Sequence, residues 1–358
     1  MLAMKDHSLA FLKRLLDTPG PSGFEVAPAR VWRTEAESFA DLVEADVTGN
    51  SRAALNPDAT LRVMFAGHID EIGLMVVHVD DDGFLSFQAI GGWDSQVLVG
   101  QRVVILGRDG PVTGVVGKKA VHLMDTEERA KVSKIKDLWI DIGATSREDA
   151  LKRVRVGDPA VIHGSALTFP NGRLVSRSID NRIGAFVVLE ALRLLADDRP
   201  EAGIWAVATA QEEIAWAGGG ARTSATDLAP RVALVVDVTH ATDVPGVEKK
   251  EVGDFKLGGG PVLSRGSAVN AVVLDLLVAT AEAEGIPYTL QAAPHDTGTD
   301  ADAIWNAHRG VATGLVSVPN RYMHSPSEMV ALDDLTAVAR LMAAFARRVT
   351  ASSDFTPR

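Results

Sequence analysis

The chain has 358 residues, of which 46% are hydrophobic and 23% are charged, a composition typical of globular proteins. The 36 Lys and Arg against 47 Asp and Glu give a net charge of −11, which argues against a nucleic-acid or anionic-membrane partner. Because the chain has no cysteine, it has no disulfides, thiol nucleophile or Cys-ligated zinc. Any metal site must therefore use His, Asp and Glu.

The length of the chain suggests two domains. No signal-peptide pattern begins the sequence, and no uninterrupted apolar segment approaches the length of a membrane span. We therefore expect a cytoplasmic protein without a membrane partner.

The two end regions of the chain show the alternation of strand and helix patterns that is typical of an α/β protein, whereas the middle region shows mainly strand patterns. Between residues 73 and 162, short β-like runs alternate with turn clusters such as Asp80-Asp81-Asp82-Gly83. We therefore expect a small β domain (73–163) inserted into an α/β domain made of 1–72 and 164–358. In the α/β part, the apolar spacing predicts helices at 7–17, 25–39, 185–195, 268–284, 300–308 and 332–348, strands at 42–47, 61–66, 204–209, 233–236, 287–291 and 311–316, and a glycine-rich loop at 246–266.

Two adjacent carboxylates, Glu212 and Glu213, follow the apolar run 204–209. The run predicts a buried strand, and the carboxyl ends of such strands face the crevice where open α/β sheets bind ligands. A Glu pair alone is more often a solvated surface feature. Metal-ligand residue types at other strand ends favour the functional interpretation here.

The strand at 61–66 leads into Gly67-His68-Ile69-Asp70. Side chains two apart on an extended segment share a face, so Asp70 can accept a hydrogen bond from one nitrogen of His68. The other nitrogen is then left for a metal. A structural histidine is an equally good explanation of this motif taken alone.

Further candidates occur along the rest of the chain. Asp180 precedes the helix at 185–195, where N-capping worth about 1 kcal/mol is an alternative explanation. Zn²⁺ and Co²⁺ accept imidazole and carboxylate ligands together. Five ligands of these types are too many for one catalytic ion, but they suit two ions that share a bridging carboxylate. The full candidate set is His68, Asp180, Glu212, Glu213, Asp237 and His324.

Six segments, taken in order, resemble the tetrahedral (TET) metallo-aminopeptidases of the Zn-exopeptidase clan, also named deblocking aminopeptidase, glutamyl aminopeptidase and endoglucanase M. They are AGHIDEIG, SIDNRIG, ATAQEEIAWAGG, VVDVTHATD, DTGTDADAI and PNRYMHSPSEMV. The resemblance covers nearly the whole chain. It implies a Zn-exopeptidase α/β sandwich with an inserted PDZ-like β-barrel domain used in dimerisation. It also implies an enzyme that removes one residue from peptides with a free N-terminus, and a homododecamer built from dimers.

Carried over residue by residue, the resemblance implies two divalent ions per subunit, Zn²⁺ or Co²⁺, bridged by Asp180. His68 and Asp237 would complete one ion site, and Glu213 and His324 would complete the other.

The same resemblance makes Glu212 the general base and Asp70 the residue that orients His68. One carboxylate of the Glu pair must stay unligated to take a proton from water and return it to the leaving amine. Four residues that bear on the substrate pocket depart from the family pattern: Ala215, Trp216, Ala217 and Asp302.

Three other functions compete with a dimetal aminopeptidase. A carboxypeptidase or deacylase with the same dimetal site would need a cluster of positively charged residues near the site to bind a substrate carboxylate. The sequence shows no clear cluster of this kind. A glycosidase uses two carboxylates without a metal, which leaves the histidines without a purpose. A non-enzymatic assembly protein would not need an intact ligand set and base.

Overall fold

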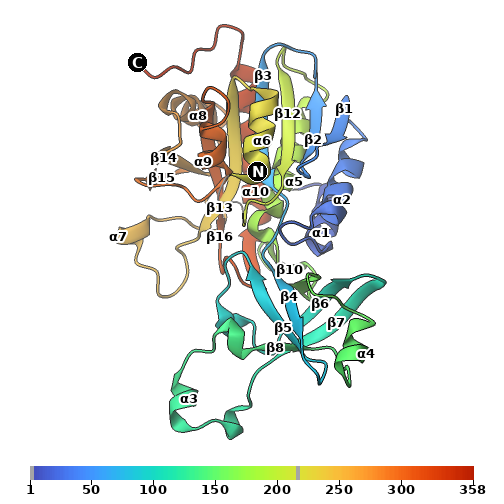
Figure 1. The fold of residues 1–358 in the computed structure, drawn as a ribbon. Helices are drawn as coiled ribbons and strands as arrows, with labels where there is room; N and C mark the ends of the chain where they lie inside the picture. Colours follow the sequence, from blue (N-terminus) through green and yellow to red (C-terminus); the bar gives the residue numbers. More distant parts are fainter. Residues whose placement is uncertain (1–3, 215–217) are drawn as a thin grey trace.

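Within residues 4–214 and 218–358, the part of the chain that the computed structural model describes, an α/β body is joined to a β barrel (Figure 1). The body carries a mixed sheet of eight strands in the order β1-β2-β12-β3-β13-β16-β14-β15. The strands are β1 (Leu42–Ala45), β2 (Ser51–Leu55), β3 (Arg62–His68), β12 (Gly203–Thr209), β13 (Val232–His240), β14 (Val262–Gly266), β15 (Thr289–Ala293) and β16 (Ala312–Asn320).

The centre of this sheet is parallel. Strands β12, β3, β13 and β16 run in one direction, and nearly all of their residues are buried, as expected for a sheet covered on both faces. Their carboxyl ends therefore lie at one edge. The register places His68, at the end of β3, directly beside Thr209, at the end of β12.

Helices cover both faces of the sheet (Figure 1). One face packs against α1, α2, α5, α8 and α10 around Phe11, Trp32 and Phe186, and the other packs against α6 and α9 around Trp205 and Ile304. The predicted α/β sandwich is therefore confirmed. The helices of the body are α1 (Asp6–Asp17), α2 (Val26–Ala36), α5 (Ile179–Leu195), α6 (Gly219–Leu228), α7 (Lys249–Val252), α8 (Ala271–Ala283), α9 (Asp300–Trp305) and α10 (Leu332–Arg348).

The barrel follows β3 in the chain and closes in the order β4-β5-β8-β7-β6-β9. Its core, which includes Leu74, Phe87 and Ile140, is separate from the cores of the body. A small inserted β barrel is thus present, as the predicted fold class requires. Its elements are β4 (Gly73–Val79), β5 (Leu85–Ile90), β6 (Arg102–Gly107), β7 (Gly110–Gly117), β8 (Trp139–Asp141), β9 (Pro159–Ile162), α3 (Thr126–Ala130), α4 (Arg147–Leu151) and the 3₁₀ turns Ser95–Val97, Val121–Leu123 and Ile135–Asp137.

A second, small sheet ties the segment after the barrel to the C-terminal part of the chain. It pairs β10 (Leu167–Phe169), β11 (Arg173–Ser176) and β17 (Glu328–Ala331) in antiparallel order. Strand β11 leads into α5, and β17 leads into α10. The small sheet therefore lies between the start of α5 on one strand and the loop before β17 on another.

The prediction of a loop at 246–266 was wrong in two places, because the segment contains the short helix α7 and ends in a strand. Strand β14 begins two residues after the cluster Gly258-Gly259-Gly260 and pairs with β15 and β16. The glycines make a turn before the strand, and the short run from Val262 is buried only because of its neighbours in the sheet. Of the helices described in this chain, none has the length and apolar character needed to cross a bilayer.

Candidate metal centre

The six candidate side chains lie together at the carboxyl edge of the central sheet. They come from distant parts of the chain, and the parallel strand order brings their segments to one edge. His68 ends β3, Glu212 and Glu213 follow β12, Asp237 lies in β13, Asp180 lies at the start of α5, and His324 lies in the loop between β16 and β17.

Asp180 is at the middle of the group. Its Oδ1 lies 3.2 Å from Nε2 of His68, and its Oδ2 lies 3.3 Å from Nε2 of His324. On one side, Oδ1 of Asp237 lies 3.9 Å from Nε2 of His68. On the other side, Oε2 of Glu213 lies 3.5 Å from Nε2 of His324. The Asp180 carboxylate thus turns one oxygen toward each imidazole.

These separations fit a divalent cation. Two ligand atoms about 2.1 Å from one tetrahedral ion lie about 3.4 Å from each other, close to the distances around Asp180. Ligand atoms of His68, Asp180 and Glu213 all lie within 4.8 Å of one another. Among the described residues, the buried Oε1 of Glu213 has no hydrogen-bond partner. The structure therefore contains a cluster able to bind metal.

The charge balance of the cluster also favours cations. Burial raises the pKa of Glu212 to about 10 and raises the pKa of Asp237 well above its usual range. Hydrogen bonds to Asp180 and Glu213 raise the pKa of His324 to about 11. Burial alone would raise the pKa of Asp180, but hydrogen bonds from His324 and His68 outweigh it and lower that pKa. The buried carboxylates outnumber the two imidazoles, so positive charge stabilises the site.

Asp180 does not cap a helix. Asn181 supplies the cap of α5, because its Oδ1 accepts the N–H of Gly184 at 3.0 Å, whereas Asp180 lies one residue before it, with φ −74° and ψ 108°. Its carboxylate faces the histidines instead, so the capping explanation is wrong. Close packing holds it there: a Cβ on Gly67 would lie 2.5 Å from the backbone of Gly184, so β3 and α5 touch at this point.

Asp70 contacts both the histidine and the Glu pair. Its Oδ1 lies 3.4 Å from Nδ1 of His68, longer than an ordinary hydrogen bond. The same carboxylate accepts the backbone N–H of Glu212 at 3.2 Å and of Glu213 at 3.1 Å. Asp70 is fully buried, and it therefore fixes the two Glu residues as well as facing the imidazole.

Comparison with known proteins decides the family. Residues 49–341 match the model of the M42 glutamyl aminopeptidase family. The chain belongs to this family. It is 34% identical to the lysyl aminopeptidase of Pyrococcus furiosus over 350 aligned residues. The alignment covers 97% of this chain and 98% of that protein. The M42 chain is a hydrolase that acts on peptide bonds, and the resemblance found in its six sequence motifs is confirmed.

Solved structures agree. The TET aminopeptidase of the marine sediment archaeon Thaumarchaeota archaeon SCGC AB-539-E09 superposes with a TM-score of 0.92 at 35% identity, covering 97% of each chain. The TET1 peptidase of Pyrococcus horikoshii has a TM-score of 0.84 at 31% identity, covering 96% of this chain and all of that one. The M42 chain therefore shares both body and barrel with TET peptidases.

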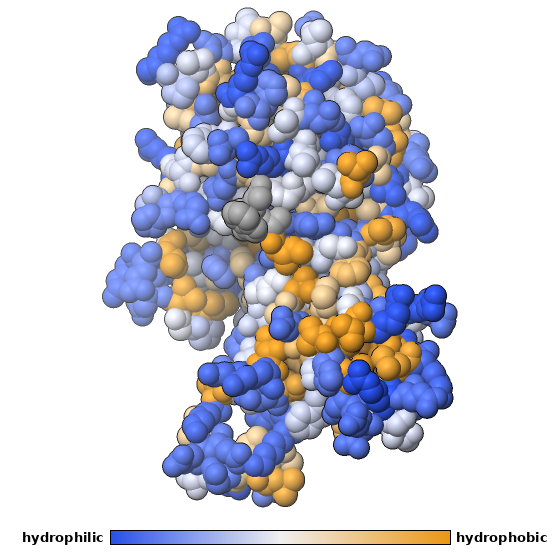
Figure 2. Space-filling model, in the orientation of Figure 1, coloured by the Kyte–Doolittle hydropathy of each residue, from blue (hydrophilic) through white to orange (hydrophobic). Residues whose placement is uncertain are grey.

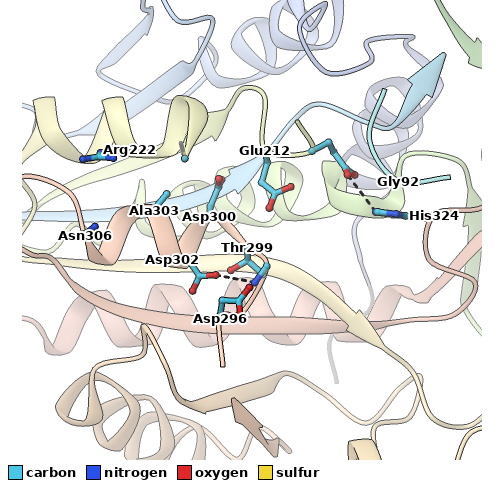
Figure 3. Close-up of a pocket in the computed structure, with 13 residues that line it drawn as sticks. Gly92, Glu212, Arg222, Asp296, Thr299, Asp300, Asp302, Ala303, Asn306 and His324 are labelled. Atoms are coloured by element: carbon cyan, nitrogen blue, oxygen red, sulfur yellow. Dashed lines mark hydrogen bonds and ion pairs between the residues drawn. The ribbon is translucent and has the colours of Figure 1, made fainter. Parts of the chain in front are cut away.

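An open pocket of about 570 Å³ adjoins the cluster in this M42 peptidase (Figure 3). Glu212, Glu213 and His324 line it on the side of the cluster. Residues of α6, of α9 and of the loop between β15 and α9 line most of the rest, together with Gly92 after β5. Oδ2 of Asp302 accepts the backbone N–H of Thr297 at 2.8 Å and of Gly298 at 2.9 Å, so Asp302 shapes the loop along the pocket. Ala215, Trp216 and Ala217, the other departures from the family pattern, lie outside the described residues.

Two buried carboxyl groups beside the cluster were not predicted from the sequence. Glu328 accepts hydrogen bonds from the backbone of Asp180 and of His324. Asp300 accepts a hydrogen bond from the hydroxyl of Thr209, and burial raises the pKa of Asp300 to about 6. Both residues occur in the motifs DTGTDADAI and PNRYMHSPSEMV, but no apolar run precedes either to indicate burial.

Proposed function

We propose that this chain is a dimetal aminopeptidase that removes the N-terminal residue from peptides. The observation that carries the proposal is the position of Asp180, with one carboxylate oxygen toward His68 and the other toward His324. His68 and Asp237 would hold one divalent ion, Glu213 and His324 would hold the other, and Asp180 would be shared. Zn²⁺ and Co²⁺ suit this set of imidazole and carboxylate ligands.

Glu212 would be the general base. When bound, two divalent ions would polarise the scissile carbonyl and make water more acidic. Oε2 of Glu212 would accept a proton from the attacking water and then donate it to the leaving amine nitrogen. Glu212 and Glu213 both line the open pocket beside the cluster, and the more exposed of the two is Glu212. Its side chain is 18% exposed against 6% for Glu213, so the more accessible carboxylate moves protons and the more buried one binds metal.

The charge of the pocket supports recognition of a free N-terminus. Asp296, Asp300 and Asp302 line it together with the Glu pair, whereas Arg222 is the one Lys or Arg in its described lining. Such a balance attracts an α-ammonium group and repels an α-carboxylate. A carboxypeptidase would need the opposite balance of charge.

We further propose that residues 73–163 form a dimerisation domain inserted between 1–72 and 164–358, and that the enzyme is a homododecamer built from dimers. The P. horikoshii TET1 peptidase can assemble into a tetrahedron. Figure 2 shows apolar side chains gathered over the barrel, and exposed apolar patches mark interaction surfaces. The exposed apolar residues of this region include Phe84, Val115, Val121, Leu123, Val132, Leu151 and Val156. Light scattering should give about twelve times the 38.0 kDa of one chain.

Matched substrates test the proposed reaction. The protein loaded with Zn²⁺ or Co²⁺ should release p-nitroaniline from an aminoacyl p-nitroanilide but not from its N-acetylated form. A panel of such substrates that differ in the first side chain would define the preferred residue. Removal of a C-terminal residue from an N-blocked peptide, with the aminoacyl substrates untouched, would contradict the proposal.

A further inference from the structure

Glu328, the first residue of β17, is a buried carboxylate placed between two of the candidate ligands. Its Oε2 accepts the backbone N–H of Asp180 at 3.0 Å. Its Oε1 accepts the backbone N–H of His324, also at 3.0 Å, and lies 3.5 Å from the amide nitrogen of Asn320. All of these donors are uncharged. One carboxylate therefore bonds to the main chain of two residues that are far apart in the sequence.

The strand pairing explains how one side chain contacts both segments. Glu328 pairs with Ser176, the last residue of β11, and Asp180 follows four residues later in the chain. The loop that carries His324 is closed by two backbone hydrogen bonds of 3.0 Å between Arg321 and Met329. Glu328 thus stands where the loop returns to the small sheet, next to the start of α5.

The backbone around both ligands needs such support. His324 has φ of 58° and Ser178 has φ of 62°, in the left-handed backbone region that residues other than glycine seldom adopt. Residues in this region keep their conformation only when their surroundings fix it. The hydrogen bond from the N–H of His324 to Glu328 fixes the residue that carries the imidazole itself.

We propose that Glu328 is a positioning residue, which sets the spacing between Asp180 and His324 and thereby the metal site that these two residues share. The inference rests on the proposed dimetal function. Neither ligand can shift relative to the other without breaking a hydrogen bond to the same carboxylate. Outer contacts of this kind orient ligands and tune the affinity of a metal site.

The substitution Glu328→Gln tests the proposal with nearly unchanged side-chain volume. The glutamine amide has one acceptor oxygen and one donor nitrogen, so it can accept only one of the two backbone N–H groups. Demetallated protein would be titrated with Co²⁺, with the number of ions, their affinities and the Co²⁺ absorption spectrum as readouts. For Glu328→Gln we expect one of the two ions to bind about 10–100-fold more weakly, with a changed spectrum.

Asp334 provides a matched control. It is also buried, and its two oxygens accept the backbone N–H of Gly258 at 2.7 Å and of Gly260 at 2.8 Å, but neither glycine carries a candidate ligand. Asp334→Asn should therefore bind two Co²⁺ ions with wild-type affinity and spectrum. A loss of metal in this control equal to that in Glu328→Gln would show general destabilisation rather than positioning, and would overturn the proposal.

Further outcomes distinguish a failure of the positioning role from a failure of the proposed dimetal function. If Glu328→Gln binds both ions as tightly as the wild-type protein, with the same spectrum, the positioning role is wrong. If the wild-type protein binds fewer than two ions, the dimetal function itself fails, and no variant is needed to see it. Should Glu328→Gln fold poorly, Glu328→Asp supplies the same comparison, because it keeps the charge but is one methylene too short to span both donors.

Discussion

Replacement of Glu212 by Gln removes the proposed base with little change elsewhere. Its backbone N–H still bonds to Asp70, because that 3.2 Å contact does not involve the side chain. The five residues proposed as ligands are all untouched. Loss of a general base costs about 10²–10⁴ in rate, which raises the barrier by about 2.7–5.4 kcal/mol. We therefore expect kcat on an aminoacyl p-nitroanilide to fall by that factor while metal content stays at the wild-type level.

The same substitution has a predictable effect on stability. Burial, with the like charges of Asp237 and Asp300, raises the pKa of Glu212 from 4.5 to about 10. In the metal-free protein, folding therefore disfavours the ionised group, and this penalty grows as pH rises above 4.5. Metal-free Glu212→Gln should melt at a temperature equal to or above that of the metal-free wild-type protein at pH 7. A fully active Gln variant would refute the base assignment, and a variant that has lost its metal would refute the division of roles within the Glu pair.

Three other predictions follow from the cluster. Asp180→Ala should lose both metal and activity, because it removes the ligand shared by the two ions; a variant that retains two ions by elemental analysis would contradict this. Asp70→Asn should lower kcat about 10–100-fold, because its carboxylate accepts the N–H groups of both Glu residues and faces His68; wild-type kinetics would exclude that role. At pH 8 the metal-free His324 is protonated, because its pKa is raised to about 11. Metal binding must therefore release protons, and the affinity for metal must rise with pH. Binding enthalpies that are the same in calorimetry buffers of different ionisation enthalpy would contradict this proton release.

The elements best predicted from the sequence were those with a clear local pattern of apolar residues. Long apolar runs gave β3, β12 and β13, and a polar residue at the end of a buried strand points to a ligand-binding edge. Spacing could not predict β2, whose sequence Ser51-Arg52-Ala53-Ala54-Leu55 has little apolar bulk. That strand is buried because β1 and β12 flank it, and such burial depends on the tertiary fold.

The candidate site shows the same limit. His68, Asp180 and His324 could be proposed because imidazole and carboxylate groups at strand ends suggest metal binding. Glu328 could not, because its importance lies in hydrogen bonds to the backbone of two distant residues. The capping explanation for Asp180 was plausible from sequence, but in the structure Asn181 caps the helix and the Asp180 carboxylate faces the two histidines.

The most direct test of the dimetal centre is anomalous diffraction at the zinc absorption edge from crystals of the Zn²⁺-loaded protein. We predict two peaks about 3.5–4 Å apart on either side of the Asp180 carboxylate, one near His68 and Asp237 and the other near Glu213 and His324. A single peak, or none within bonding distance of Asp180 in protein that hydrolyses peptides, would contradict it.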